Sequence, residues 1–137
     1  MIIQAAQPEH FGWLTERTGY IPGGDFRAIE AVHDGRILAM VGYDNWLWTS
    51  ARAHIAVDVP VRSILRPAFS YPFEEAGRRI LLGQVSAGNE KSLRLAKHLG
   101  FREVYRTRDG AAEGQDLVFL EMRKEDCRWL YAARKAA

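Results

Sequence analysis

Residues Gly88–Phe101, with the sequence GNEKSLRLAKHLGF, carry the most complete set of helix signals in the chain. Asn89 can accept a hydrogen bond from the backbone N–H of residue 91 or 92 and so cap a helix. Gly100 suits the left-handed conformation that ends a helix, and Phe101 begins the next strand directly afterwards. The apolar side chains between them fall on one stripe and the charged ones on the other. This stretch therefore predicts a helix that packs on a sheet and is tied closely to the next strand.

Alternating and continuous apolar runs on both sides of this helix predict strands. The hairpin at 26–44 has the clearest signal, because Asp34 and Gly35 can take the positive φ angles of a two-residue turn. The predicted strands are 1–6, the two arms of 26–44, 51–59, 78–86, 101–108 and 116–123, with a polar loop at 109–115. The stretch at 78–86 contains an apolar run, which is typical of a strand buried on both faces.

Helices are predicted at 8–18, 62–77, 88–99 and, as a short terminal element, in 124–137. The second of these contains two prolines. Pro67 suits a first turn, whereas Pro72 is expected to kink or split the helix. The resulting order, β-α-β-β-β-α-β-α-β-β, predicts an α/β (α+β) fold with a mixed sheet and helices on both faces.

Composition favours a globular protein of one domain, residues 1–137. Hydrophobic residues make up 47% of the chain, and the net charge of +2 is too small to imply nucleic-acid binding. Cys127 is the one cysteine and the four histidines show no paired spacing, so neither a disulfide nor a metal site is predicted. The N-terminus shows no signal peptide and no window reaches transmembrane length, so we expect a cytoplasmic protein without membrane contact.

The pattern N-x-x-S-x-x-L-x-x-x-L-G-F at 89–101, after a buried strand, resembles the second half of the GNAT acetyltransferase fold. The order of elements is similar to that family over nearly the whole chain, which implies a mostly antiparallel sheet of six to seven strands. The stretches YPFEEAG, HLGFREVYRTRDG and EMRKEDCRWL are similar to small GNAT-like proteins of phages and prophages. The resemblance implies transfer of acetyl from acetyl-CoA, as co-substrate, to an amine of a small molecule or protein.

The resemblance also implies where the cofactor binds. Acyl-CoA would enter a wedge-shaped gap between strands 51–59 and 78–86. The pantetheine arm would pair with the fourth strand, and the pyrophosphate would lie at unpaired amides of the following turn and helix N-terminus. The residues implied are Val57, Asp58 and Val59 for pantetheine, Arg62, Ser63 and Ile64 for pyrophosphate, and Asn89 and Ser92 on the opposite side.

Two positions depart from the family pattern. The stretch VDVPVRSILRPAF at 57–69 contains no glycine, where the family has a glycine-rich phosphate loop, so side chains limit how closely a phosphate can approach the backbone. Arg62 and Arg66 could compensate through charge-assisted contacts. Ala96 stands where the family often has a general-acid tyrosine.

Three residues are candidates for proton transfer. His54, in the fourth strand, could deprotonate an amine, or it could be a hydrogen-bonded strand histidine. Glu30 could be a general base that reaches the cleft, or an outward-facing carboxylate. Tyr105 could protonate the leaving thiolate, or it could be a packed aromatic residue. Trp46 and Trp48 would point the same way in an extended segment and could line a substrate mouth, form a homodimer contact or fill the core.

Two other functions remain open from sequence alone. A GNAT-fold protein without catalysis, serving binding or assembly in a phage, would explain the missing glycines. A GNAT-like protein that modifies nucleic-acid bases is the other alternative, although the near-neutral charge speaks against it.

Overall fold

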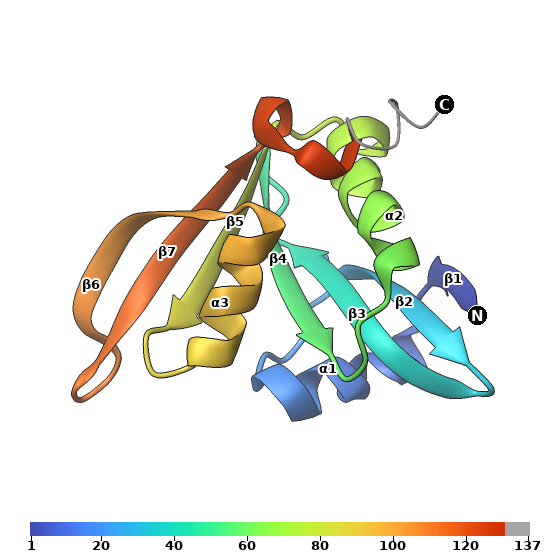
Figure 1. The fold of residues 1–137 in the computed structure, drawn as a ribbon, viewed down its shortest axis with the longest axis horizontal. Helices are drawn as coiled ribbons and strands as arrows, with labels where there is room; N and C mark the ends of the chain where they lie inside the picture. Colours follow the sequence, from blue (N-terminus) through green and yellow to red (C-terminus); the bar gives the residue numbers. More distant parts are fainter. Residues whose placement is uncertain (131–137) are drawn as a thin grey trace.

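The computed structural model describes residues 1–130 and forms a seven-stranded sheet in the order β1-β2-β3-β4-β5-β7-β6 (Figure 1). The strands are β1 (Ile2–Ala5), β2 (Arg27–His33), β3 (Arg36–Asp44), β4 (Ser50–Val57), β5 (Ile80–Ser86), β6 (Arg102–Ala112) and β7 (Gln115–Arg123). Neighbouring strands are antiparallel except β4 and β5, which are parallel. The predicted mixed, mostly antiparallel sheet is confirmed.

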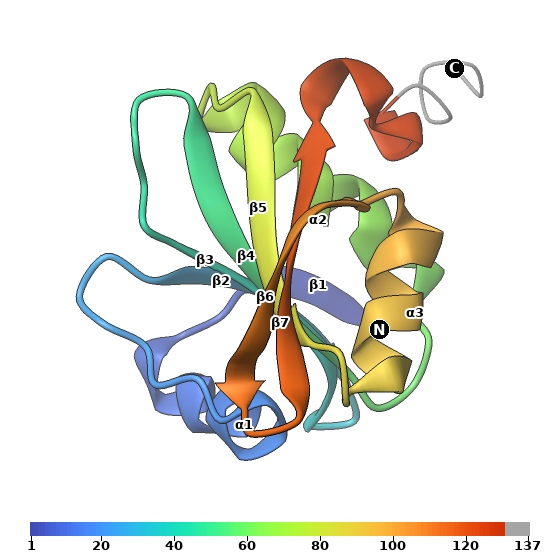
Figure 2. The same ribbon diagram turned by 90° about the vertical axis from the view of Figure 1, so that its left-hand side faces the viewer.

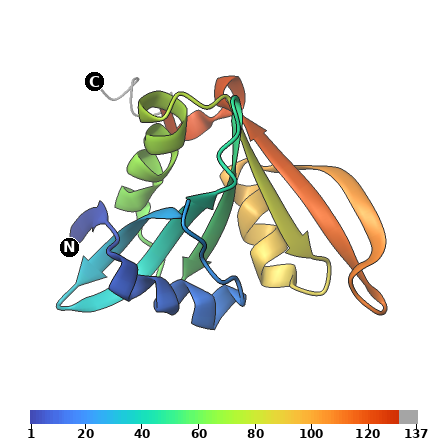
Figure 3. The same ribbon diagram turned by 180° about the vertical axis from the view of Figure 1, so that it is seen from behind.

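Helices cover both faces of this sheet, as predicted. The helical elements are η1 (Pro8–His10), α1 (Phe11–Thr18), η2 (Arg62–Ile64), α2 (Leu65–Ser70), η3 (Tyr71–Glu75), α3 (Glu90–Leu99) and η4 (Lys124–Asp126). Figure 1 shows α2 and α3 in front of the strands, and Figure 3, from behind, shows α1 on the opposite face. Each face has its own apolar core. Phe73 and Leu81 belong to the larger core, and Leu14 and Phe26 belong to the core beneath α1.

The hairpin of β2 and β3 forms where the sequence predicts it. His33 pairs with Arg36, so the turn contains two residues, Asp34 and Gly35, with φ angles of 51° and 74°. Positive φ at both central positions gives the backbone twist that matches two antiparallel strands. The turn therefore sets the pairing of β2 and β3 next to it, and a register shift follows between Ala31 and Val32.

The caps of α3 also confirm their prediction. The side chain of Asn89 accepts a hydrogen bond from the backbone N–H of Ser92 at 3.2 Å. Gly100 has a φ of 115°, and its N–H donates to the carbonyls of the last turn. Phe101 is 4% exposed and lies in the larger core. The helix is therefore held at both ends and leads directly into β6.

The two prolines divide the segment between β4 and β5. Pro67 lies in the first turn of α2, where a missing N–H does no harm. Pro72 lies in the first turn of η3, where the α-helix gives way to a wider π-helical turn. The helix expected to kink or split at Pro72 instead changes its hydrogen-bonding pattern there, and helical backbone continues to Glu75.

Two expectations differ from the structure, and a third is tested only in part. The predicted loop at 109–115 is wrong, because β6 runs to Ala112 and pairs it with Gln115 in a long hairpin. The prediction that 78–86 is buried on both faces is also wrong, since most of β5 is only half-buried. Of the predicted terminal helix, the structure shows η4 and, at 128–130, α-helical residues, while 131–137 lie outside the described residues.

Candidate functional site

The two halves of the sheet meet over a short parallel contact. β4 and β5 pair only at Ser50 with Ile80, Ala51 with Leu81 and Arg52 with Leu82. Beyond that point β4 continues to pair with β3, and β5 continues to pair with β7 as far as Ser86. The two strands therefore diverge, and Figure 3 shows β4 and β5 separating from their upper ends. The predicted wedge-shaped gap is present.

The free edge of β4 faces this gap with unpaired backbone groups. The N–H of Asp58 donates to the carbonyl of Leu38 at 2.8 Å, which makes this antiparallel pair a hydrogen-bonded one. Such pairs alternate along a ladder, so Ile55 and Val57 direct their N–H and C=O groups away from β3. Because the pairing with β5 ends at Arg52, these groups of Ile55 and Val57 can bond to an extended ligand.

A cleft of about 940 Å³ passes through the sheet at this gap. One wall is formed by the end of α1, the loop after it and β4, and the other by β5 and α3. Its apolar part on the α3 side is formed by Val85, Leu95, Ala96, Phe101 and Leu120. Its polar part on the α1 side includes Arg17, Tyr20, Arg52, His54 and Asp58.

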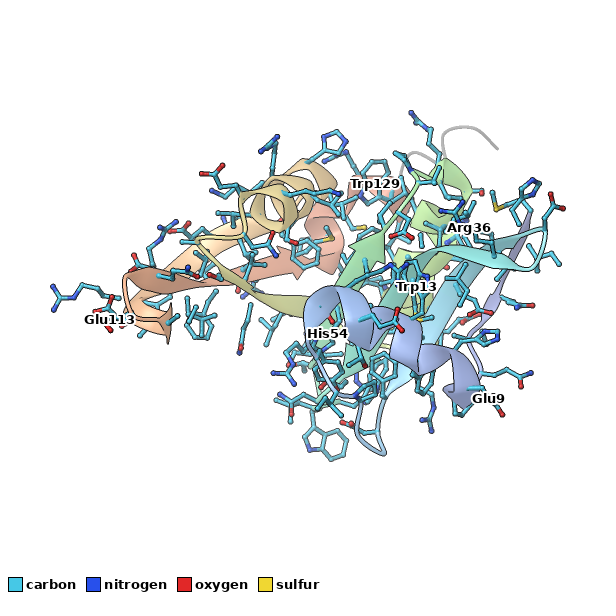
Figure 4. The ribbon with its side chains drawn as sticks, turned by 90° about the horizontal axis from the view of Figure 1, so that it is seen from below. Glu9, Trp13, Arg36, His54, Glu113 and Trp129 are labelled. Carbon is cyan, nitrogen blue, oxygen red and sulfur yellow. The ribbon has the colours of Figure 1, made fainter. Side chains whose placement is uncertain are left out.

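Asp44 does not line the cleft itself but binds three of the polar side chains that do. It lies at the end of β3, pairs with Arg52 in the β3–β4 register and is 4% exposed. Its carboxylate accepts hydrogen bonds at 2.6–2.9 Å from three side chains, those of Tyr20, Arg52 and His54. Arg52 and His54 are two residues apart on β4, so both side chains stand on the α1 face of the sheet. Figure 4 shows His54 beside α1.

These contacts set the protonation states of the cluster. Burial acts to raise the pKa of the Asp44 carboxyl, but its three hydrogen-bond donors outweigh burial and hold that pKa well below its usual value. Burial lowers the pKa of His54, and the hydrogen bond to Asp44 opposes this effect only in part. Burial, together with the hydrogen bond to Asp44, raises the pKa of Tyr20 to about 12. At neutral pH the cluster therefore holds an ionised Asp44, a neutral His54 and a neutral Tyr20.

The hydrogen bond between His54 and Asp44 fixes the tautomer of the imidazole. An ionised carboxylate only accepts hydrogen bonds, so Nε2 of His54 donates its proton to Asp44 at 2.8 Å. Nδ1 then carries the lone pair. Within the described residues Nδ1 has no hydrogen-bond partner and is not sealed from solvent. His54 is therefore arranged as a base that opens into the cleft.

Aromatic packing holds the histidine ring. The ring of Tyr20 stacks on that of His54, with centroids 3.8 Å apart. The ring of Phe26 in turn packs against the ring of Tyr20. Phe26 lies directly over Gly42, which pairs with His54 across the strands. A Cβ at Gly42 would stand 2.1 Å from the Phe26 ring, so the glycine makes this packing possible.

The residues predicted to bind the cofactor divide into two groups. Those that line the cleft are Val57, Asp58, Asn89 and Ser92, and those that do not are Val59, Arg62, Ser63 and Ile64.

The structure corrects part of the predicted anion site. The unpaired amide predicted at Ile64 is wrong, because its N–H donates to the carbonyl of Val61 at 3.4 Å, and its side chain is buried in the core. The amides of Asp58 and Val59 both donate to the carbonyl of Leu38. In residues 1–130 no such acceptor is found for the amides of Arg62 and Ser63.

Two of the three proton-transfer candidates lie away from the cleft lining. Glu30 is fully buried in β2, where Gln4 donates to its carboxylate at 2.7 Å and His10 lies at 2.8 Å. Tyr105 is 65% exposed on β6, with its ring near Phe119. Neither residue lines the cleft, whereas His54 does.

The two tryptophans between β3 and β4 do not point the same way, because the segment is a loop rather than an extended strand. Trp46 packs against Tyr43 and Tyr71, and its indole N–H donates to the carbonyl of Asp25. Trp48 is 96% exposed. The extended segment on which a shared direction depended is therefore not formed.

Sequence reasoning missed Asp44, Arg52, Tyr20 and Arg17. A signal for the first two exists: the spacing of Arg52 and His54 places them on one strand face, and a short connection at 45–49 brings Asp44 opposite them. No local signal identifies Tyr20 or Arg17, because both reach β4 from α1 and its loop.

Among residues 1–130 no group of three or more His, Cys, Asp or Glu side chains is placed to hold a metal ion. In the same part of the chain, no helix combines the length and apolar character needed to span a membrane.

Neither a protein-family model nor a curated protein matches the sequence. Solved structures do match the fold. The F149A mutant of spermidine N-acetyltransferase SpeG from Vibrio cholerae superposes with a TM-score of 0.72 at 14% identity, covering 97% of this chain and 99% of that one. The same enzyme in complex with CoA and spermine gives 0.70 at 13% identity, covering 91% and 96%. A probable acetyltransferase gives 0.61 at 22% identity, covering 74% and 64%.

At these identities the likeness establishes the fold. The chain has the mixed α/β fold of GNAT-like acetyltransferases, and it is similar over nearly its whole length to a polyamine N-acetyltransferase.

Proposed function

We propose that this chain is an acyl-CoA-dependent N-acetyltransferase that moves the acetyl group of acetyl-CoA to an amine. The observation that carries the proposal is the early end of the β4–β5 pairing, which opens a cleft beside the neutral, Asp44-bound His54. A matching fold alone does not define an activity, so the argument depends on this site. The CoA and spermine bound by one structural neighbour support the same chemistry.

The free edge of β4 suits the pantetheine arm. Its amide groups can pair with the N–H and C=O groups of Ile55 and Val57, much as another strand would. The thioester then lies toward the closed end of the cleft, near His54, and the nucleotide toward the open end. A backbone N–H of β4 aimed at the thioester carbonyl would stabilise the negative charge that develops on its oxygen.

Transfer is direct. The amine nitrogen attacks the thioester carbonyl carbon, the C–S bond breaks and the thiolate of CoA leaves. Nδ1 of His54 takes the proton that the nitrogen loses, directly or through one water, and Asp44 stabilises the imidazolium that forms. The thiolate regains a proton from solvent or from this imidazolium. Ala96, in the position of the family's tyrosine, has no group that could supply that proton.

The lining of the cleft bears on the acceptor. Its described residues include the cations Arg17, Arg52 and Lys91, and Asp58 is the one carboxylate among them. Asp58 is already bound to Arg17. A polycationic acceptor would find little free negative charge there, so an amine without several further positive charges fits this chain better.

The proposed function is tested by measuring transfer of the acetyl group by the purified protein. Incubation with acetyl-CoA and a panel of amines should release CoA thiol, and calorimetry should show binding of acetyl-CoA. Absence of binding at millimolar acetyl-CoA would remove the proposal.

The glycine-free stretch after β4 favours a second candidate, a GNAT-fold binding or assembly protein without catalysis, of the phage type that the sequence resembles. A cleft filled by its own side chains would support it, but the cleft here is open. Base modification of nucleic acid would require a basic groove beside the cleft. A cytoplasmic location and a homodimer remain proposals, to be tested by fractionation and by light scattering.

A further inference from the structure

The open end of the cleft holds an ion pair between two elements far apart in sequence. Arg17, at the end of α1, donates from Nε and Nη2 to the two carboxylate oxygens of Asp58, both at 2.8 Å. Asp58 follows directly after β4, in the stretch without glycine. Both side chains line the cleft and both are about 30% exposed. The pair therefore stands where a ligand that runs along β4 leaves the sheet.

Arg17 is held in place from two further sides. Its third donor, Nη1, bonds to the carbonyl of Trp13 at 2.9 Å, and the guanidinium stacks over the Trp13 ring at 3.7 Å. A guanidinium fixed in this way presents a planar fork that suits a carboxylate or a phosphate equally. The donors that would meet a phosphate are the two that Asp58 now occupies.

Positive charge gathers around this carboxylate. The hydrogen bond from Arg17 is the main cause that lowers the pKa of Asp58, and the charges of Arg36 and Lys91 add to it. Lys91 also lines the cleft, on the α3 side. Arg62, which the sequence suggested as a phosphate ligand, does not. The cations that line the cleft at its open end, Arg17 and Lys91, thus come from α1 and α3 and not from the turn after β4.

We propose that Arg17 binds the diphosphate of CoA, with Asp58 as the internal anion that occupies its guanidinium in the unliganded protein. This assignment rests on the proposed function. The side chain of Arg17 replaces the backbone cradle that a glycine-rich loop would form. When the cofactor enters, the diphosphate displaces the carboxylate from Nε and Nη2, while Trp13 keeps the guanidinium in place. Asp58 therefore competes with the ligand.

If Asp58 competes with CoA for Arg17, replacing Arg17 and replacing Asp58 should change the affinity for CoA in opposite directions. An ion pair that only stabilised the fold would not give this result. Calorimetric titration with CoA should show Arg17→Ala weakening binding about tenfold, the loss of a charge-assisted contact. Asp58→Asn keeps the shape but removes the competing charge, so it should tighten CoA binding several-fold. Arg108→Ala removes an exposed arginine of β6 as a matched control and should leave the affinity unchanged.

Titration with dephospho-CoA, which keeps the diphosphate but lacks the 3′-phosphate, identifies the group that is bound. Arg17→Ala should weaken both ligands to the same extent. An effect seen with CoA alone would assign Arg17 to the 3′-phosphate and overturn the proposal.

If Asp58→Asn weakens CoA binding as Arg17→Ala does, the pair only braces the fold and the proposal fails, although the function stands. If the wild-type protein binds no CoA, the proposed function and this inference fail together. Circular dichroism of each variant confirms that the fold is retained.

Discussion

At the scale of single residues, the proposed chemistry depends on Asp44, the residue of β3 that is hydrogen-bonded to His54. An isolated strand histidine has neither a fixed tautomer nor a fixed orientation. Asp44 supplies both through one hydrogen bond at 2.8 Å, and the stacked ring of Tyr20 limits rotation. Because Asp44 also binds Arg52, its charge is retained in a site that is almost closed to solvent.

Replacing His54 by glutamine should reduce kcat by about 100-fold or more, since a positioned general base contributes about 10²–10⁴-fold. The wild-type rate should fall as pH drops through a midpoint below 6.5, because burial lowers the pKa of His54 and the protonated ring cannot accept a proton. His54→Gln should lack this acid limb. His33→Gln, at an exposed position of β2, is the control and should keep it. An unchanged pH profile in His54→Gln would exclude the histidine as the base.

Asp44→Asn should lower both activity and stability. A carboxyl whose pKa is lowered in the folded state stabilises the protein above its unfolded pKa of 3.8, and this stabilisation is lost as pH falls below that value. Asp44→Asn should therefore unfold more easily at pH 7, by about 1–3 kcal/mol. The difference from wild type should narrow at pH 3. Urea unfolding at both pH values measures it, and a difference that does not depend on pH would contradict the ionised state of Asp44.

Gly42→Ala tests the packing that supports His54. The new Cβ would overlap the Phe26 ring, which is buried between Phe11 and Tyr20 and cannot move without displacing them. Overpacking of this kind costs about 1–3 kcal/mol. Gly12→Ala, with no atom within 4 Å of the new Cβ, should not destabilise the protein. Equal stability of the two variants in urea would refute this account of Gly42.

At the scale of elements, the sequence predicts what is locally determined. The turn at Asp34 and Gly35 and the caps of α3 require particular backbone angles and hydrogen bonds from residues a few positions apart. Such features can be predicted from the sequence because they do not depend on contacts between residues far apart in the chain. The change of helix type at Pro72 has the same origin, since the missing N–H acts within one helical turn.

Asn89 offers a test at this scale because it caps α3 and lines the cleft. Asn89→Ala should cost about 1 kcal/mol of stability through the lost cap. Asn89→Asp keeps the cap acceptor and should retain stability, but its negative charge should weaken CoA binding. Thermal unfolding and titration with CoA separate the two effects. Normal CoA binding by Asn89→Asp would place the anionic part of the cofactor elsewhere.

The β6–β7 hairpin shows where local signals fail. Glycines and polar residues at 109–115 favour a loop by composition, but the strands continue around a register shift between Thr107 and Ala112. Asp109 takes a φ of 56° there, and the side chain of Asp116 accepts a hydrogen bond from its amide. Pairing across the hairpin thus overrides the local preference. Glu113 lies near the hairpin tip, far from His54 (Figure 4).

At the scale of the whole molecule, the cleft follows from how two antiparallel halves are joined. Strands β1 to β4 form one half and β5 to β7 the other, and a parallel contact of three residue pairs connects them. Figure 2 looks at the sheet from the β6 side, with β6 and β7 in front of β5 and β4. Each half has its own twist, so a contact this short lets them diverge. The apolar residues within 78–86 suggest full burial. Nothing in that stretch indicates where β4 stops pairing with β5.

The central claim is that this divergence admits a thioester cofactor. A crystal structure of the wild-type protein with CoA tests it most directly. The account predicts the pantetheine arm between β4 and β5, bonded to the backbone of Ile55 and Val57, with its thiol end beside His54. CoA bound elsewhere on the surface, or β4 and β5 paired along their full length in the crystal, would contradict it.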